Sequence, residues 1–594
     1  MPDPHRRGLP RVLAPTLGAS VALSGAFLLA PAMGTDLAAQ QARADFFAEH
    51  GWAPVDFGWY GGVGQFGYSL LTAPLGSVVG MRVLGAVAAV VAAVAFGWLL
   101  WRTGARRPLA GGLIGALVFA ANLASGRITF AVGLALALGA LCVAAAEPPG
   151  PGWRRRLWIA GVCALSALAT WASPVAGLFA GLAGAALLLT GPVQAGFRSW
   201  RPGGAGPDQA GSRSMRPGGA GPNQAGFPSL RPGGAGPGRA GFRSLRPGGA
   251  GPVWAGFLSL RLDGWWPQAL SLCLGPVLAL APMALLFGNG GRQPFTAESM
   301  KLHIALAVLV VLVVPPRYLA VRIAGALTVV LLLGAFYLPS PIGSNALRLP
   351  MLFTIPVLAA LASLGRVRLV LLLAAVFWWQ PFVVTGDLGR AGSPESRPEF
   401  HQSLVRELAR RAPGRVEVVP LRDHWESVYV ADQVPLARGW ERQVDTDRNA
   451  LFYRDALSPQ DYVAWLRANA VSYVAIAPES VPDRYARSES ALVLSGVPEL
   501  RQVWRDDTWR LYEVIGAQPL VAAPAQLVRS DRGGVAVRVP LGGDVLVRVH
   551  WSRWLSLTGP AACLTAGPDG WTELHVATPG EYRLTSSLRP GPKC

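Results

Sequence analysis

Asp36 is the residue whose position most clearly suggests chemistry. It stands in the segment GTDL (34–37), directly where the first long apolar run of the chain ends. A carboxylate at such a depth is costly unless water, a cation or a partner charge meets it, which makes it a candidate for function. Asp45 and Asp56 follow in the same loop and could hold a divalent cation beside it. The other interpretation of these acids is that they solvate an ordinary loop.

Basic and aromatic side chains near the ends of other apolar runs could complete a site around Asp36. Transfer of a sugar from a lipid phosphate needs a carboxylate that deprotonates the acceptor hydroxyl and cations that meet the phosphate. The cationic candidates are Arg127, Arg292 and Arg348, with Lys301 and His303 close to Arg292 in sequence. Aromatic side chains that suit a sugar face or the membrane interface follow Asp36, at Trp52, Phe57, Trp59 and Tyr60. Arg348 could instead be an interfacial anchor.

The composition places these residues in a membrane protein. Of the 594 residues, 52% are hydrophobic and only 15% are charged, and the mean hydropathy is +0.36. Such a chain is too apolar for a soluble protein of this size. Spans are expected at 12–33, 82–101, 108–124, 128–146, 157–172, 174–190, 267–287, 302–316, 318–338, 350–364 and 367–386. The sequence thus predicts an α-helical multi-pass membrane bundle of about 11 spans, with the first span retained rather than cleaved.

The distribution of charge predicts how the chain is oriented. The formal net charge is +19, of which residues 1–389 contribute +18 and the remainder +1. Expected inner loops carry clusters of arginine, whereas expected outer loops carry single arginines, as the positive-inside rule requires. The N-terminus is therefore expected to be cytoplasmic, and the loop 35–68 and the C-terminal region extracytoplasmic, in a plasma membrane. The basic excess suits loops that face anionic lipid better than a nucleic acid partner.

Changes in composition divide the chain into further regions. A 15-residue unit rich in Pro, Gly and Arg recurs within 195–264, which predicts a disordered cytoplasmic linker or a basic arm that binds lipid or a partner. It separates two parts of the membrane bundle, 1–194 and 265–389. Residues 390–516 alternate helix and strand patterns and predict a small α/β domain. Short alternating runs in 517–594 predict a β-sandwich-like module.

The last module carries two further features. Trp551, Trp554 and Trp571 could form a platform for sugar stacking, although such residues more often belong to the core of a sandwich. Cys563 and Cys594 could pair if their compartment is oxidising. The sequence contains no nucleotide-binding Walker motif and no nucleophile elbow, so ATP-driven transport and hydrolase chemistry are unsupported.

Several motifs resemble the GT-C superfamily of multi-pass glycosyltransferases. They are GTDL (34–37), the aromatic, glycine-rich loop that leads to YSLLTAPL (68–75), NLASGR (122–127) and NALRLP (345–350). The segments 439–443, 449–453 and 509–514 are similar to actinobacterial integral membrane proteins of this type. The resemblance implies that Asp36 is a base or metal ligand. Family members often carry paired acids in this loop, whereas Asp36 stands alone, which leaves the need for a divalent cation open.

The expected function is therefore that of a GT-C-like membrane glycosyltransferase. The resemblance implies a polyprenyl-phosphate sugar as donor and a cell-envelope glycan, lipid or protein as acceptor on the outer face. The alternatives are a secondary transporter or flippase, and a non-catalytic envelope-assembly protein. Acids and polar residues are scarce within the spans, where a transporter would be expected to hold a coupling ion.

Overall fold

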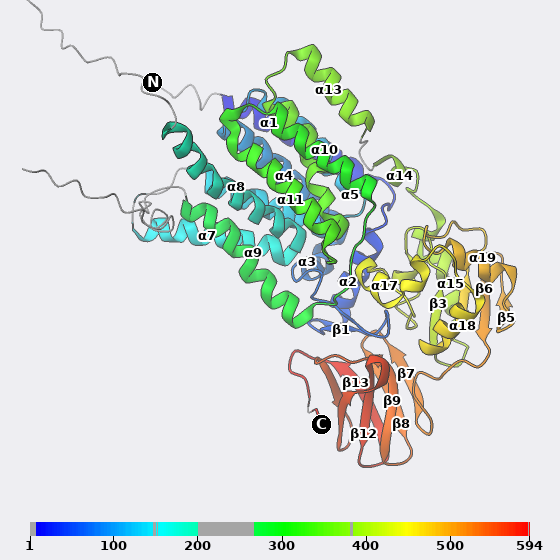
Figure 1. Cartoon of the computed structure of the whole chain (residues 1–594). Helices are drawn as coiled ribbons and strands as arrows, with labels where there is room; N and C mark the ends of the chain where they lie inside the picture. Colours follow the sequence, from blue (N-terminus) through cyan, green and yellow to red (C-terminus); the bar gives the residue numbers. More distant parts are fainter. Residues whose placement is uncertain (1–7, 147–149, 151, 200–265, 380–383, 592) are drawn as a thin grey trace, which may run out of the picture. The chain divides into compact units, whose positions relative to one another are not determined.

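The computed structural model describes residues 8–146, 150, 152–199, 266–379, 384–591 and 593–594 (Figure 1). The chain divides into two units, residues 1–190 with 265–594 and residues 191–264, and of the second only the first residues, at the end of helix α8, are described. The repeat predicted at 195–264 therefore lies almost entirely outside the described residues. All contacts reported below belong to the other unit, residues 1–190 with 265–594.

Helices occupy every position at which the apolar runs predict a span. They are α1 (Leu9–Leu29), α4 (Met81–Arg102), α5 (Pro108–Ala124), α6 (Ile128–Ala145), α7 (Trp153–Ala172), α8 (Pro174–Ser199), α9 (Trp266–Phe287), α10 (Ala297–Val313), α11 (Leu319–Tyr337), α12 (Arg348–Leu361) and α13 (Arg366–Trp379). Among the described residues, six stretches are long and apolar enough to cross a membrane, and α5 and the first part of α8 are shorter apolar helices. The chain is thus a multi-pass membrane protein, while the full count of about 11 spans remains a prediction.

The helices pack against one another through small side chains and expose large apolar ones. In a soluble protein the large apolar side chains would instead be buried. On α4 the buried face carries alanines such as Ala89 and Ala93, whereas Val83, Val87 and Val91 are exposed. Large apolar side chains can face outward where the surroundings are hydrocarbon, and small side chains let helix backbones approach closely. In agreement with this, α4 packs against α1, α5 and α6.

Residues 390–516 contain the mixed helix and strand structure that their pattern predicts. The sheet has the order β3-β4-β6-β5, with β3 parallel to β4 and the other pairs antiparallel. Its strands and main helices are β3 (Arg415–Val418), β4 (Val471–Ile476), β5 (Leu500–Arg505), β6 (Arg510–Val514), α15 (Pro398–Leu408), α18 (Pro459–Ala468) and α19 (Arg487–Ser495). Ser458 caps α18, since its side chain accepts a hydrogen bond from the Asp461 amide at 3.1 Å.

The C-terminal residues form two antiparallel sheets, drawn from orange to red in Figure 1. The sheet orders are β10-β13-β8-β7 and β11-β12-β9. The strands are β7 (Gln526–Asp531), β8 (Gly534–Val539), β9 (Gly543–His550), β10 (Leu555–Thr558), β11 (Ala562–Ala566), β12 (Trp571–Val576) and β13 (Gly580–Ser586). Trp571 is buried and stacks on His550, and the Trp554 indole N–H donates to the Leu286 carbonyl at 2.8 Å. These tryptophans are engaged in packing, which favours the core interpretation over a sugar platform.

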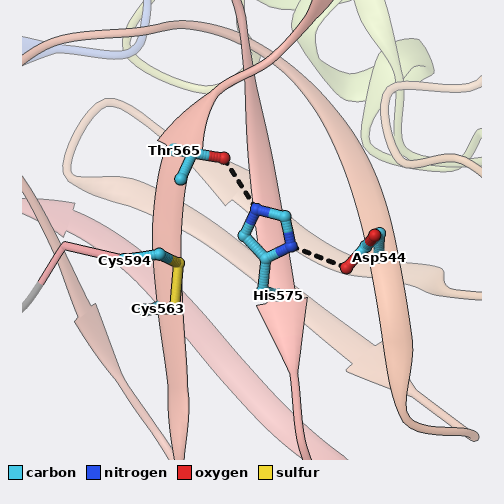
Figure 2. Close-up of a disulfide and its surroundings, with 5 residues drawn as sticks. All are labelled: Asp544, Cys563, Thr565, His575 and Cys594. Atoms are coloured by element: carbon cyan, nitrogen blue, oxygen red, sulfur yellow. Dashed lines mark hydrogen bonds and ion pairs between the residues drawn. A yellow bond between two sulfur atoms is a disulfide. The ribbon is translucent and has the colours of Figure 1, made fainter.

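Cys563 and Cys594 form a disulfide in this module. Figure 2 shows it on β11, beside a polar row that crosses the sheet. In that row His575 Nδ1 lies 2.6 Å from Asp544 Oδ1, and His575 Nε2 lies 2.7 Å from Thr565 Oγ1. The disulfide ties the end of the described chain to an edge strand, which would otherwise be free to fray.

Loss of the disulfide is expected to destabilise this module measurably. The bond closes a loop of 31 residues, for which chain entropy predicts about 3–4 kcal/mol of stabilisation. We expect the double variant C563S/C594S to unfold at a correspondingly lower urea concentration in the intact chain. Reductant should lower the midpoint of the wild type and leave that of the double variant unchanged. Equal midpoints for the two oxidised proteins would contradict the prediction.

Candidate active site

Close contact between two glycine-containing segments sets the position of Asp36. Gly34 has a φ of +90° and Gly126 a φ of +76°, a region that favours glycine. A Cβ atom at Gly34 would collide with the backbone of Ser125 and Gly126, and one at Gly126 would meet the Leu37 amide nitrogen at 2.5 Å. The GTDL and NLASGR segments therefore lie backbone against backbone, which brings Asp36 next to Arg127.

Gln40 holds these two segments together. It lies in α2 (Leu37–His50), the helix that begins directly after Asp36, and it is buried. Its amide group donates to the carbonyl oxygens of Asp36, at 2.8 Å, and of Gly126. Its side-chain oxygen accepts from the Thr129 amide at 2.7 Å. One buried side chain thus joins the start of α2 to the start of α6 and leaves little freedom to the Asp36 backbone.

Two arginines face the Asp36 carboxylate. Asp36 Oδ2 lies 3.4 Å from Arg127 Nε and 3.5 Å from Arg348 Nη2. Arg348 begins α12 and lies over the ring of Phe130, 5.3 Å from its centroid. About a quarter of the Asp36 side chain remains exposed. The site therefore combines an accessible carboxylate with two cations. Arg127 follows Asp36 in the sequence by about 90 residues, and Arg348 follows it by more than 300.

A large apolar cavity opens beside Arg348. It has a volume of about 700 Å³ and lies among side chains of α8, α9 and α11. Its polar residues include Tyr68, Asn345, Arg348 and Glu441, and these also line a small cavity of about 70 Å³ that contains Asp36. The apolar space is of the size that holds a small-molecule ligand, and it ends at a guanidinium.

A second large cavity lies beside Arg127. It has a volume of about 580 Å³, and Thr35 and Ser125 contribute to its wall. Its basic residues, which we call the arginine basin, are Arg127, Arg390, Arg422, Arg442, Arg484 and Arg487. Arg442 also lines the small cavity of Asp36. Asp36 thus stands between an apolar cavity and a strongly basic one.

The structure places the other predicted site residues elsewhere. Arg292 and Lys301 are exposed and line none of these three cavities, and His303 is buried with Nδ1 2.7 Å from the Ser299 carbonyl oxygen. Trp59 and Tyr60 are buried, where the Trp59 indole donates to the Ser427 carbonyl and the Tyr60 hydroxyl to that of Gly439. These two aromatic residues pack the loop 35–68 against residues 390–516 and do not line the cavities beside Asp36.

The acids considered as metal ligands also have other partners. Asp56 is fully buried and paired with Arg532 at 2.5 Å, and Asp45 accepts a hydrogen bond from Gln41 at 2.7 Å. Burial raises the pKa of Asp45. In the part of the chain that the structure describes, no group of three or more His, Cys, Asp or Glu could hold a metal ion. The Asp36 carboxylate does not fit a divalent cation because it faces two guanidiniums, which repel a cation.

Several residues that were not proposed as site residues from the sequence connect the loop 35–68 to the α/β residues 390–516. Arg43 joins this loop to residues 439–443, because it contacts Glu441 at 2.5 Å and stacks on Tyr68. Asn289 donates to Glu441 at 3.2 Å and to the Gly64 carbonyl at 2.9 Å. Tyr68 and Glu441 stand in segments that carry the GT-C resemblance, which is the one signal in the sequence that could have singled them out.

A buried histidine stabilises the wall of the arginine basin. His424 stacks on Trp440, with Nδ1 3.4 Å from Glu426 and Nε2 3.7 Å from Asp483. Burial by itself lowers the pKa of His424, but the two carboxylates outweigh burial and raise it to about 9. The same imidazolium and Arg442 outweigh the effect of burial on Asp483 and lower its pKa.

This arrangement predicts an alkaline loss of stability. Because the pKa of His424 is raised from its ordinary 6.5 to about 9, its contribution is complete below pH 6.5 and is lost as the pH rises through 9. The contribution is on the order of 3 kcal/mol. We expect the urea midpoint of the intact chain to fall between these pH values, and that of H424Q to fall less. Identical pH profiles for the two proteins would contradict the prediction.

The comparisons with known proteins concern the last module and the whole fold. A family model described as a domain of unknown function, DUF8823, matches residues 522–594. No curated protein matches the chain. Among solved structures, a mutant of arabinofuranosyltransferase AftD from Mycobacteria is 14% identical, with a TM-score of 0.41 over 97% of this chain and 60% of that one. ArnT from Cupriavidus metallidurans, bound to undecaprenyl phosphate, is 13% identical, with a TM-score of 0.40 over 86% of this chain and 99% of that one.

The first of these proteins is an arabinofuranosyltransferase, and the second is seen with undecaprenyl phosphate bound. The chain spans about 60% of the length of AftD. Since the identities are low and both TM-scores lie below 0.5, the activity has to be argued from the side chains around Asp36.

Proposed function

We propose that this chain is a membrane glycosyltransferase that transfers a sugar from a polyprenyl-phosphate donor to a cell-envelope acceptor on the outer face. The observation that carries the proposal is the accessible carboxylate of Asp36, held between Arg127 and Arg348, the second of which also lines the apolar cavity. The cavity offers room for part of a prenyl chain, and Arg348 stands where the phosphate of such a lipid would end.

The chemistry assigns a separate task to each charged group. Asp36 accepts the proton of the acceptor hydroxyl, whose oxygen attacks the anomeric carbon of the donor sugar. A new glycosidic C–O bond forms while the bond between the anomeric carbon and the phosphate oxygen breaks. The polyprenyl phosphate leaves with an additional negative charge, which Arg348 and Arg127 stabilise. Both cations lie within 3.5 Å of the Asp36 carboxylate, so acceptor and leaving group would meet at one place.

Blocking the apolar cavity tests the donor assignment. Ala284 lines the cavity on α9, whereas Ala281 lies one turn earlier on the same helix, is exposed and does not line it. Overfilling a site costs typically about 1–3 kcal/mol, so A284W should weaken the apparent affinity for a polyprenyl-phosphate sugar by about tenfold or more. A281W should leave it nearly unchanged. Transfer measured in proteoliposomes with equal donor dependence in both variants would contradict a lipid donor in this cavity.

A further inference from the structure

The arginine basin carries far more positive charge than its own acids compensate. Six guanidiniums line it, against the two carboxylates of Asp387 and Asp483. Two more carboxylates pair with basin arginines from outside the lining: Asp36 lies 3.4 Å from Arg127, and Asp423 lies 3.4 Å from Arg390. Both lining acids already have partners. Ser125 donates to Asp387 at 2.7 Å and Arg390 lies 3.7 Å from it, while Asp483 faces His424 and Arg442. The excess of positive charge in a concave site attracts anions.

Three nitrogens of the basin's arginines are buried without a hydrogen-bond acceptor. They are Arg127 Nε, Arg390 Nε and Arg442 Nη1, and none of them has a hydrogen-bond partner among the described residues. Arg127 Nε is near Asp36 but is not in hydrogen-bond geometry with it. A buried donor that lacks an acceptor costs free energy, more so when it is charged. Three such donors on arginines that line one cavity favour an anionic ligand there, which would compensate their charge.

Aromatic rings hold two of the arginines in place at this cavity. Arg442 lies 4.9 Å from the Trp440 ring centroid and 4.6 Å from that of Tyr485, and Arg484 lies 4.4 Å from the same tyrosine ring. A guanidinium fixed by stacking loses little freedom when it binds, and its planar fork matches a carboxylate or a phosphate. The basin is therefore preorganised for acidic groups.

The basin adjoins the proposed reaction centre. Arg127 lines it and contacts Asp36, and Arg442 lines both the basin and the small cavity of Asp36. We infer that the acceptor is an anionic glycan, whose phosphate or carboxylate groups bind in the arginine basin while its hydroxyl reaches Asp36. This inference rests on the proposed function, because it takes the ligand of the basin to be the acceptor of the transferase.

Binding of defined oligosaccharides to the intact chain in detergent tests the inference. The probes are tetragalacturonate, a phosphorylated maltotetraose, and neutral maltotetraose, with binding followed by tryptophan fluorescence. Either acidic probe should bind about tenfold or more tightly than the neutral one, and affinity should fall as salt is raised. The acid that binds more tightly identifies the carboxylate or the phosphate as the recognised group. Equal binding of acidic and neutral probes would overturn the inference.

Matched arginine variants locate the binding. R422Q/R484Q/R487Q removes three exposed basin arginines, while R454Q/R505Q/R589Q removes three exposed arginines that do not line the basin. The basin variant should bind the better acidic probe about tenfold or more weakly, and the control variant like the wild type. Equal losses in both variants, or in neither, would overturn the inference.

The same proteins separate this inference from the proposed function. D36N should retain binding of the acidic probe while losing transfer, because Asp36 does not line the basin. If no sugar transfer occurs in any protein but the basin variant still loses acid binding, the transferase proposal fails and the anion site stands. If the basin variant transfers sugar as well as the wild type does, the acidic acceptor is wrong and the transferase proposal stands.

Discussion

Replacement of Asp36 by Asn is expected to lower sugar transfer by about 10²–10⁴-fold, the range in which a positioned general base contributes. Asparagine keeps the size of the side chain but cannot accept the hydroxyl proton, and it no longer balances Arg127 and Arg348. The activity can be measured as transfer of labelled sugar from a polyprenyl-phosphate donor in proteoliposomes. Envelope glycans in a strain that lacks the native copy provide the corresponding readout in cells.

D45N is the matched control for this experiment. Asp45 lies on α2, the helix that begins directly after Asp36, but its carboxylate is hydrogen-bonded to Gln41 and is not paired with Arg127 or Arg348. We expect D45N to keep nearly full activity at equal protein levels. Unchanged transfer in D36N would refute the assignment of the base. A loss in D45N as large as in D36N would contradict the assignment of the base to Asp36 alone.

Removal of Arg532 is expected to have the largest effect on stability. Arg532 lies in the turn between β7 and β8 and reaches the segment 35–68, where it pairs with Asp56 and donates to the Ala42 carbonyl at 2.8 Å. Asp56 is 0% exposed and the Arg532 side chain 2%. Breaking a buried ion pair leaves an uncompensated charge, which costs about 3–5 kcal/mol. R532M should therefore unfold at a much lower urea concentration than the wild type in the intact chain.

Two further variants determine whether the unpaired charge is the cause. D56N/R532M removes both charges and should recover part of the lost stability, because no buried carboxylate then remains unpaired. R529M changes a neighbouring arginine whose side chain is 77% exposed, and it should alter stability by no more than about 1 kcal/mol. If the double variant is no more stable than R532M, packing rather than charge explains the loss.

The sequence alone identified the helices and the main charged groups of the site. Every expected span coincides with a helix, because a chain in hydrocarbon must satisfy its backbone hydrogen bonds locally and therefore forms helices wherever apolar runs occur. The Ser458 cap likewise depends on a few neighbouring residues, so it is determined by local sequence. Asp36, Arg127 and Arg348 were candidates because each is a charge at the end of an apolar run.

Only the tertiary structure decided which charges meet. Arg292 and Arg348 look alike in sequence as single arginines of outer loops, yet Arg348 contacts Asp36 and Arg292 is exposed. Asp56 was a weaker candidate in the same loop, and it is paired with Arg532, which lies hundreds of residues later. Such pairings depend on the close approach of distant segments, as at Gly34 and Gly126, and no local pattern of residues encodes that approach. The arginine basin could not be predicted from the sequence for the same reason, because its arginines come together only when the bundle and the α/β region are folded.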